Sequence, residues 1–376
     1  MKTQEFSVGP KFIMGHHSTE ELSKLTVKKA YIICDPFMAQ SRMVEAVLKE
    51  LMKAGAETKV FSKVVPNPTI EVIAESVSEI KEFKPDIVVA LGGGSALDST
   101  KAVLKVYTES EKVAKPKMIA IPTTSGSGSE ITAFAVISDP LKNEKFVIID
   151  DSMVPDMAIL DTYFTMSVPP AVTADAGMDV LTHGLEAIVA NGATDFSDAC
   201  AEKAITLSYK YLFETYQNGQ NQFAREKMHN ASAIAGIAFN NAGLGICHSL
   251  SHAIGAFFHA PHGRINTMLL PHVIAFNASL KEKEETAVTR RYAQVANLLG
   301  LYGPTPTHGV RALNYAITSL AKKMRMPMTI EGLGIDRHEF EKMIPEMAKR
   351  ALADACTPGN PRSVTIEDLE AIYRAL

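Results

Sequence analysis

Short apolar runs and amphipathic segments alternate along the first 160 residues of the chain. Runs rich in Val and Ile predict strands at Tyr31–Cys34, Lys59–Val64, Ile87–Leu91, Met118–Ile121 and Phe146–Ile149. Between the earlier runs, Met43–Ala54 and Thr69–Phe83 carry apolar residues at helical spacing and end before Gly or Lys-Pro. This alternation predicts an α/β domain with a mostly parallel sheet covered by helices.

The pattern changes at Pro169-Pro170, after which β-branched runs become rare and Ala and Leu dominate. Long helical patterns follow at Ala174–Ala190, Ala199–Tyr216 and Arg225–Phe239. We therefore expect two domains: an α/β domain over residues 1–170 and an all-helical domain over residues 171–376.

Composition narrows the classes of partner. The 376 residues contain 38 Lys+Arg and 42 Asp+Glu, a net charge of −4, which argues against binding nucleic acid or an anionic membrane. The four cysteines show no paired spacing, so we expect no disulfide framework and a reducing, cytoplasmic location. Residues 228–263 lack Asp, Glu, Lys and Arg but contain five histidines, which predicts a buried helical region rather than a membrane span.

A glycine-rich loop follows the strand predicted at Ile87–Leu91. Gly92-Gly93-Gly94 leads into a helical pattern, and the N-terminus of a helix offers free N–H groups to a phosphate. A tight turn without a ligand would use the same glycines, and the sequence is not GxGxxG. The loop alone therefore leaves both interpretations open.

A second loop, Thr123–Glu130, follows the strand predicted at Met118–Ile121 and is rich in hydroxyl groups and glycine. Loops at the carboxyl ends of neighbouring parallel strands converge where open α/β sheets bind nucleotides. Asp35 ends another predicted strand, where its carboxylate can accept hydrogen bonds from a ribose and repel a 2′-phosphate, which favours NAD over NADP. An ordinary turn aspartate would look the same.

Histidines and one aspartate predict a metal site. Asp179 and His183 are four residues apart and so share one face of a helix. The uncharged stretch adds four clustered histidines, His248, His252, His259 and His262. Clustered imidazoles in apolar surroundings need partners, and a metal ion is one; neutral core histidines bonded to backbone carbonyls are the alternative. Spacing does not decide which of the four are ligands.

Four ordered motifs carry a resemblance to a known family. GGGSALD, PTTSGSGSE, GMDVLTHGLEA and CHSLSHAIGAFFHAPHG resemble the iron-dependent (group III) alcohol dehydrogenases, especially those like propanol dehydrogenase. The resemblance implies a Rossmann-like dinucleotide-binding domain followed by a helical metal-binding domain, the fold shared with dehydroquinate synthase. It also implies metal ligation by Asp179, His183, His248 and His262, and it places His252 near the substrate as a non-ligand.

By the same resemblance, Fe(2+), with Zn(2+) as an alternative, and NAD(H) are the expected cofactors. The expected reaction is hydride transfer between small primary alcohols and NAD, with the metal as Lewis acid and His252 passing the proton. The implied cofactor-binding residues are Asp35, Asn67, Gly92, Gly93, Gly94, Ser95, Asp98, Thr123, Thr124, Ser127, Thr132 and Lys145.

Other functions are compatible with parts of this pattern. A diol dehydrogenase or lactaldehyde reductase differs only in substrate, and zinc polyol dehydrogenases and dehydroquinate synthase-like lyases share the fold class. A lyase acting on a phosphorylated acid needs basic residues that the histidine motifs lack. A scaffold protein without activity would not need all four ligands. By analogy we expect a homodimer, and relatives like propanol dehydrogenase suggest an aldehyde dehydrogenase partner in a bacterial microcompartment.

Overall fold

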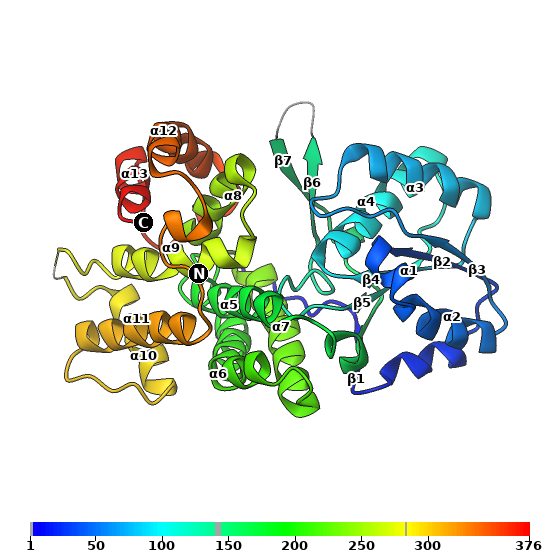
Figure 1. The fold of residues 1–376 in the computed structure, drawn as a ribbon, viewed down its shortest axis with the longest axis horizontal. Coiled ribbons are helices and arrows are strands. Elements are labelled where there is room, and N and C mark those ends of the chain that lie inside the picture. The colour runs from blue at the N-terminus through cyan, green and yellow to red at the C-terminus, as the bar shows by residue number, and fades with distance from the viewer. Residues whose placement is uncertain (1–2, 140–143, 283) are drawn as a thin grey trace. The chain divides into compact units, whose positions relative to one another are not determined.

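The computed structural model describes residues 3–139, 144–282 and 284–376, and the chain divides into two compact units. One unit is Val8–Val168, and the other is Pro169–Leu376 together with the residues up to Ser7 (Figure 1). Phe6 and Ser7 contact the helices of the second unit. The backbone N–H and C=O of Ser7 bond to the Asn241 side chain at 2.8 and 2.9 Å, and the Phe6 ring lies 5.4 Å from that of Phe196.

The first unit contains a sheet of six parallel strands in the order β1-β8-β5-β4-β2-β3. Its strands are β1 (Lys11–Met14), β2 (Lys29–Cys34), β3 (Glu57–Phe61), β4 (Ile87–Gly92), β5 (Lys117–Pro122) and β8 (Met157–Leu160). The helices of this unit are α1 (Pro36–Gln40), α2 (Met43–Lys53), α3 (Ile70–Phe83) and α4 (Gly94–Glu111).

Both faces of the sheet are buried, because successive side chains on a strand point to opposite faces. In β2, Tyr31 and Ile33 pack with residues of α3 and α4, whereas Ile32 and Cys34 pack with residues of α2. The predicted parallel sheet covered by helices is confirmed by this arrangement.

One of the predicted strands is not part of the six-stranded sheet. Phe146–Ile149 belongs to β7 (Glu144–Ile149), which pairs antiparallel with β6 (Phe134–Asp139) in a separate two-stranded sheet. The predicted strand is therefore confirmed, but it lies outside the parallel sheet. β-propensity identifies a strand but not its neighbour, which depends on the chain between the two.

The second unit is helical. Its helices are α5 (Pro170–Ala187), α6 (Asp195–Gln217), α7 (Gln222–Ala242), α8 (Ile246–Phe258), α9 (His262–Asn277), α10 (Ala287–Leu298), α11 (Pro306–Lys323), α12 (Arg337–Ala353) and α13 (Ile366–Arg374). Pro170 starts α5 at a position where a missing N–H costs nothing. Gly177 lets α6 approach α5 closely, since a Cβ there would lie 2.1 Å from Leu212 Cδ1.

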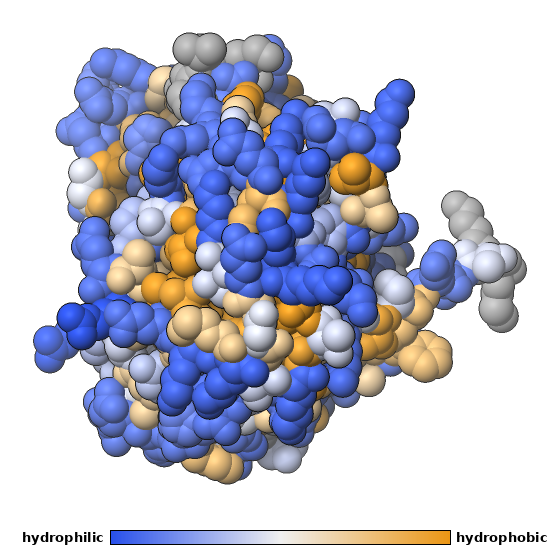
Figure 2. All heavy atoms as spheres, turned by 90° about the vertical axis from the view of Figure 1, so that its right-hand side faces the viewer, coloured by the Kyte–Doolittle hydropathy of each residue, from blue (hydrophilic) through white to orange (hydrophobic). Residues whose placement is uncertain are grey.

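Within the described residues, no helix combines the length and apolarity needed to cross a bilayer. Figure 2 shows one face of the molecule, on which hydrophilic residues predominate and apolar residues form small groups between them.

Candidate functional site

The first glycine loop joins β4 to α4. Gly92 has φ +152°, and a Cβ there would lie 2.6 Å from that of Ala96, so this position requires glycine. Gly93 caps α4 and Ser95 lies in its first turn, which leaves the N–H groups at the start of an 18-residue helix directed into the loop.

The second loop lies against the first, as the sequence predicts. Thr123 N–H donates to the Gly92 carbonyl at 3.0 Å. A Cβ on Gly93 would lie 3.2 Å from Thr124 Oγ1, and one on Gly94 would lie 3.0 Å from Ser127 Cβ. The glycines thus allow the two loops to make contact.

Asp35 follows β2, whose neighbour in the sheet is β4. Its Oδ1 caps α1 by accepting from Met38 N at 3.0 Å, and its Oδ2 lies 3.4 Å from where a Gly92 Cβ would stand. In the sheet β3 lies beside β2 on the side away from β4, and β5 lies beside β4 on the side away from β2, so strand order reverses between β2 and β4. The two loops and Asp35 flank this point.

Two of the predicted cofactor residues also hold the second loop in place. The carboxylate of Asp98 accepts from Ser129 Oγ at 2.6 Å and from Val136 N at 3.0 Å. The buried Lys101 donates to Thr132 Oγ1 at 3.1 Å and to the Phe134 carbonyl at 2.8 Å. Contact of Asp98 and Thr132 with a cofactor stays a prediction.

Near this network, burial raises the pKa of Glu130 to about 7. Its Oε1 has no hydrogen-bond partner among the described residues. Of the remaining predicted cofactor residues, Asn67 has a left-handed backbone with φ 55°. Lys145 lies in β7, but its side chain is outside the described residues.

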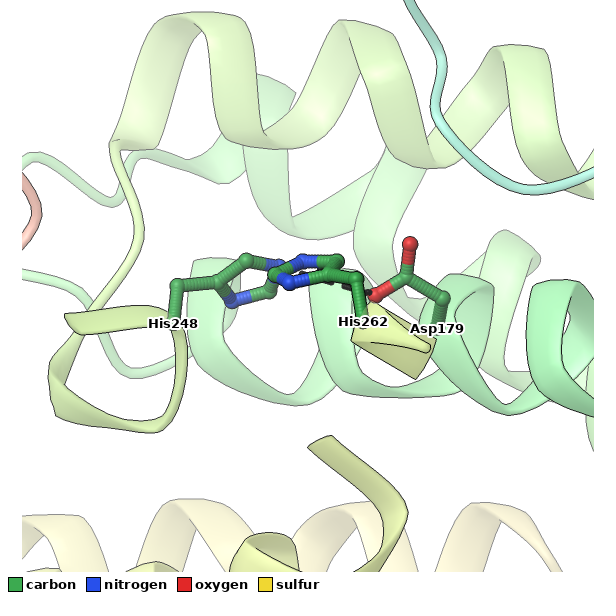
Figure 3. Close-up of side chains that lie close together, drawn as sticks. All are labelled: Asp179, His248 and His262. Carbon is green, nitrogen blue, oxygen red and sulfur yellow. Dashed lines mark ion pairs between the residues drawn. The ribbon is translucent and has the colours of Figure 1, made fainter. Parts of the chain in front are cut away.

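Asp179, His248 and His262 converge in the helical unit. Asp179 projects from α5, His248 from α8 and His262 from the first turn of α9 (Figure 3). Asp179 Oδ1 lies 3.7 Å from Nε2 of His248 and 3.7 Å from Nε2 of His262. The fourth predicted ligand, His183, is buried and stacks on the His248 ring with centroids 4.7 Å apart, so its ligation stays a prediction.

These donors fit a divalent cation. Tetrahedral ligands at about 2.1 Å from an ion lie roughly 3.4 Å from one another, close to the separations observed. Although burial alone would raise the pKa of Asp179, the three nearby histidines lower it, which favours the carboxylate form. Burial lowers the pKa of His262, which favours the neutral imidazole that a metal requires.

Hydrogen bonds around the cluster aim its donor atoms. Glu186 accepts from His248 Nδ1 at 2.5 Å and from Cys247 N at 2.7 Å. Ser251 Oγ lies 3.1 Å from His262 Nδ1, and Asn266 Nδ2 donates to Asp179 Oδ1 at 2.7 Å. Partners of this kind fix the tautomer and orientation of metal ligands.

The sequence analysis did not identify the three residues whose side chains orient the ligands, Glu186, Ser251 and Asn266. Only Glu186 had a visible signal, as the one charged residue in the apolar segment 181–190.

His252 lies beside the cluster, and its ring stacks on His262 with centroids 5.4 Å apart. Its Nδ1 bonds to Asp354 Oδ2 at 2.9 Å. Burial alone would raise the pKa of Asp354, but the hydrogen bond from His252 lowers it to about 2. Asp354 is therefore ionised, and His252 Nδ1 carries the proton. Asp354 was also missed by sequence reasoning. His259 is exposed and caps α8 in a left-handed conformation.

Two family models match the chain. The model described as "Iron-containing alcohol dehydrogenase" matches residues 10–162, and "Fe-containing alcohol dehydrogenase family, C-terminal" matches residues 173–376.

Individual proteins are similar over the full length. The chain is 40% identical to 1-propanol dehydrogenase PduQ of Citrobacter freundii, over 99% of this chain and 100% of the relative. It is 37% identical to the NADPH-dependent butanol dehydrogenase of Clostridium saccharobutylicum, over 96% and 95%. Among solved structures, a 1,3-propanediol oxidoreductase has 30% identity and a TM-score of 0.92, covering 100% of both chains.

Proposed function

Because the chain belongs to the family of iron-containing alcohol dehydrogenases, we propose that it interconverts small primary alcohols and aldehydes with NAD(H). Propanol, ethanol and butanol define the size class. The observation that carries the site assignment is the convergence of Asp179 Oδ1 with the Nε2 atoms of His248 and His262 at 3.7 Å.

In this proposal Fe(2+) is held by Asp179, His183, His248 and His262. One carboxylate and three imidazoles also suit Zn(2+). The cation supplies Lewis acidity toward the substrate oxygen, and NAD(H) exchanges the hydride. Glu186 and Ser251 hold two of the imidazoles with Nε2 directed at Asp179. The donors therefore need little reorganisation to bind the ion.

His252 is the proposed proton acceptor in alcohol oxidation. Its Nδ1–H is bonded to the ionised Asp354, which leaves the lone pair on Nε2. Asp354 thus acts as a positioning residue, because it selects the tautomer of His252 that can accept a proton.

The proposed cofactor site consists of the two contacting loops and Asp35, with the remaining predicted residues around them. The Asp35 carboxylate beside Gly92 favours a ribose hydroxyl over a 2′-phosphate, and hence NAD over NADP. The similar butanol dehydrogenase is described as NADPH-dependent, so the experiment must compare both cofactors.

A diol is the second candidate substrate, supported by the structural similarity to a 1,3-propanediol oxidoreductase. Family membership favours both substrates over polyol dehydrogenation and the lyase reaction. We also propose a cytoplasmic homodimer. Association with an aldehyde dehydrogenase in a microcompartment stays a prediction from the resemblance.

The test is a panel of aldehydes and diols assayed with NADH and NADPH, using anaerobically purified protein loaded with Fe(2+) or Zn(2+). We expect the highest kcat/KM for propanal or butanal with NADH. Asp179→Ala should lose bound metal and turnover together. Full metal content and turnover in that variant would refute the site assignment, and absence of turnover in every metal form would refute the function.

A further inference from the structure

A second group of metal-binding side chains lies beside the first, formed by His252, Asp354 and Cys356. One donor atom from each lies within 4.8 Å of the other two. The side chains of His252 and Asp354 are 29% and 17% exposed, so an ion can reach the group from solvent through them. Cys356 is half-buried behind them. We call this group the second cluster. The proton transfer proposed above uses His252 and Asp354 but not Cys356.

Local structure brings the three side chains together. Asp354 caps the C-terminus of α12, and its Oδ1 accepts from Cys356 N at 2.8 Å, which folds the cysteine back towards the carboxylate. Its Oδ2 accepts from His252 Nδ1 at 2.9 Å, which connects α8 to this turn. The second cluster therefore joins segments about 100 residues apart.

A thiolate, an imidazole and a carboxylate are donors typical of Zn(2+), with a fourth position open to water. Magnesium and calcium prefer oxygen donors, so a thiol selects for softer cations. The carboxylate of Asp354 and the thiolate of Cys356 together balance the two charges of the ion. Because burial raises the pKa of the Cys356 thiol, the thiol is neutral before binding, and the cation must displace its proton. The net charge of the group then changes from −1 to zero, so no positive charge is left next to the first site.

We propose that the second cluster binds a thiophilic divalent cation such as Zn(2+) and that this cation inhibits the enzyme. On binding, the Cys356 thiol releases its proton to solvent, and the Nδ1 proton of His252 moves to Nε2 so that Nδ1 ligates the ion. His252 then has no free lone pair for proton transfer. The inhibition rests on the proposed function, whereas cation binding does not.

The experiment uses the whole protein loaded with Co(2+), whose visible absorption reports the first site. Titration with Cd(2+) should produce an ultraviolet thiolate-to-cadmium band at one equivalent while the cobalt spectrum stays unchanged. Cys356→Ser should abolish the band. Zn(2+) should inhibit the parent enzyme, and in the variant the inhibitory concentration, measured relative to the variant's own activity, should rise by an order of magnitude.

Cys200→Ser is the matched control, because Cys200 is also half-buried but lies on α6, outside the cluster. It should keep both the band and the inhibition. A band that persists in Cys356→Ser, or that is absent from the parent protein, would overturn the proposal. Loss of the cobalt spectrum in proportion to inhibition would also overturn it, since Zn(2+) would then act by displacing the first metal. The cadmium band needs no turnover, so failure of the proposed function would be seen separately.

Discussion

The substitution Glu186→Gln tests whether the hydrogen bond between Glu186 and His248 strengthens metal binding. Glu186 is 3% exposed, and its two oxygens accept from two different donors, Cys247 N and His248 Nδ1. Glutamine has the same shape but only one oxygen. One of the two N–H groups must therefore lose its acceptor, or His248 must move its proton to Nε2, the atom that faces Asp179.

Either outcome weakens metal binding by a similar amount. A buried donor left without an acceptor costs about 1–3 kcal/mol. Loss of an outer partner of a metal-bound histidine reduces metal affinity roughly 10–100-fold, or about 1.4–2.7 kcal/mol. We therefore expect Glu186→Gln to bind Fe(2+) or Co(2+) one to two orders of magnitude more weakly.

The assay is competition with a chelator of known affinity, followed by cobalt absorption, with thermal unfolding of the metal-free protein measured in parallel. Glu50→Gln is the matched control, because Glu50 is 5% exposed but lies on α2 and pairs with Lys53. It should leave metal affinity unchanged. Parent-like affinity in Glu186→Gln, or reduced stability with no loss of affinity, would refute the reasoning.

Three further predictions concern the proton path, the buried acid and the cofactor loops. Asp354 accepts from both Cys356 N and His252 Nδ1, and an amide has only one oxygen, so in Asp354→Asn the amide nitrogen faces His252 and favours the wrong tautomer. The variant should keep its metal but lose roughly 10²–10⁴ in kcat; a parallel loss of metal content would contradict this. Burial raises the pKa of Glu130 from 4.5 to about 7, so its contribution to stability is complete below pH 4.5 and lost as the pH rises through 7. Glu130→Gln should therefore be more stable than the parent above pH 7, by up to about 3 kcal/mol, and identical pH dependence in urea unfolding would count against it. Gly94→Ala brings a Cβ to 3.0 Å from Ser127 Cβ, so the KM for NADH should rise about tenfold, and an unchanged KM would exclude the predicted contact of the loops with the cofactor.

The central strands β2, β4 and β5 could be predicted because each is apolar and buried on both faces, as in Ile87–Gly92. Parallel pairing of these strands could be inferred only where a predicted helix lies between one strand and the next in the sequence. Nothing in the apolar run Phe146–Ile149 distinguishes a sheet strand from one arm of the β6–β7 pair. Strands β1 and β8 have only four residues each, too few for a periodic pattern to stand out.

The metal cluster was predictable only where its residues are close together in the sequence. Asp179 and His183 share one helix, so their spacing carries information. His248 bonds to a residue 62 positions away and His252 to one 102 positions away, which no local pattern encodes. Spacing left four histidines equivalent. Tertiary geometry separates them, because His248 and His262 face Asp179 whereas His252 bonds to Asp354.

The contacts of Phe6 and Ser7 with the helical unit impose an order on folding during synthesis. These residues are made before their partners Phe196 and Asn241, which follow 190 and 234 positions later. Val8–Val168 can form its sheet while the preceding residues wait without their partners. The second unit is complete only when residues from both sides of Val8–Val168 have been made, so changes at Phe6 or Ser7 would destabilise the helical unit rather than the sheet that follows them.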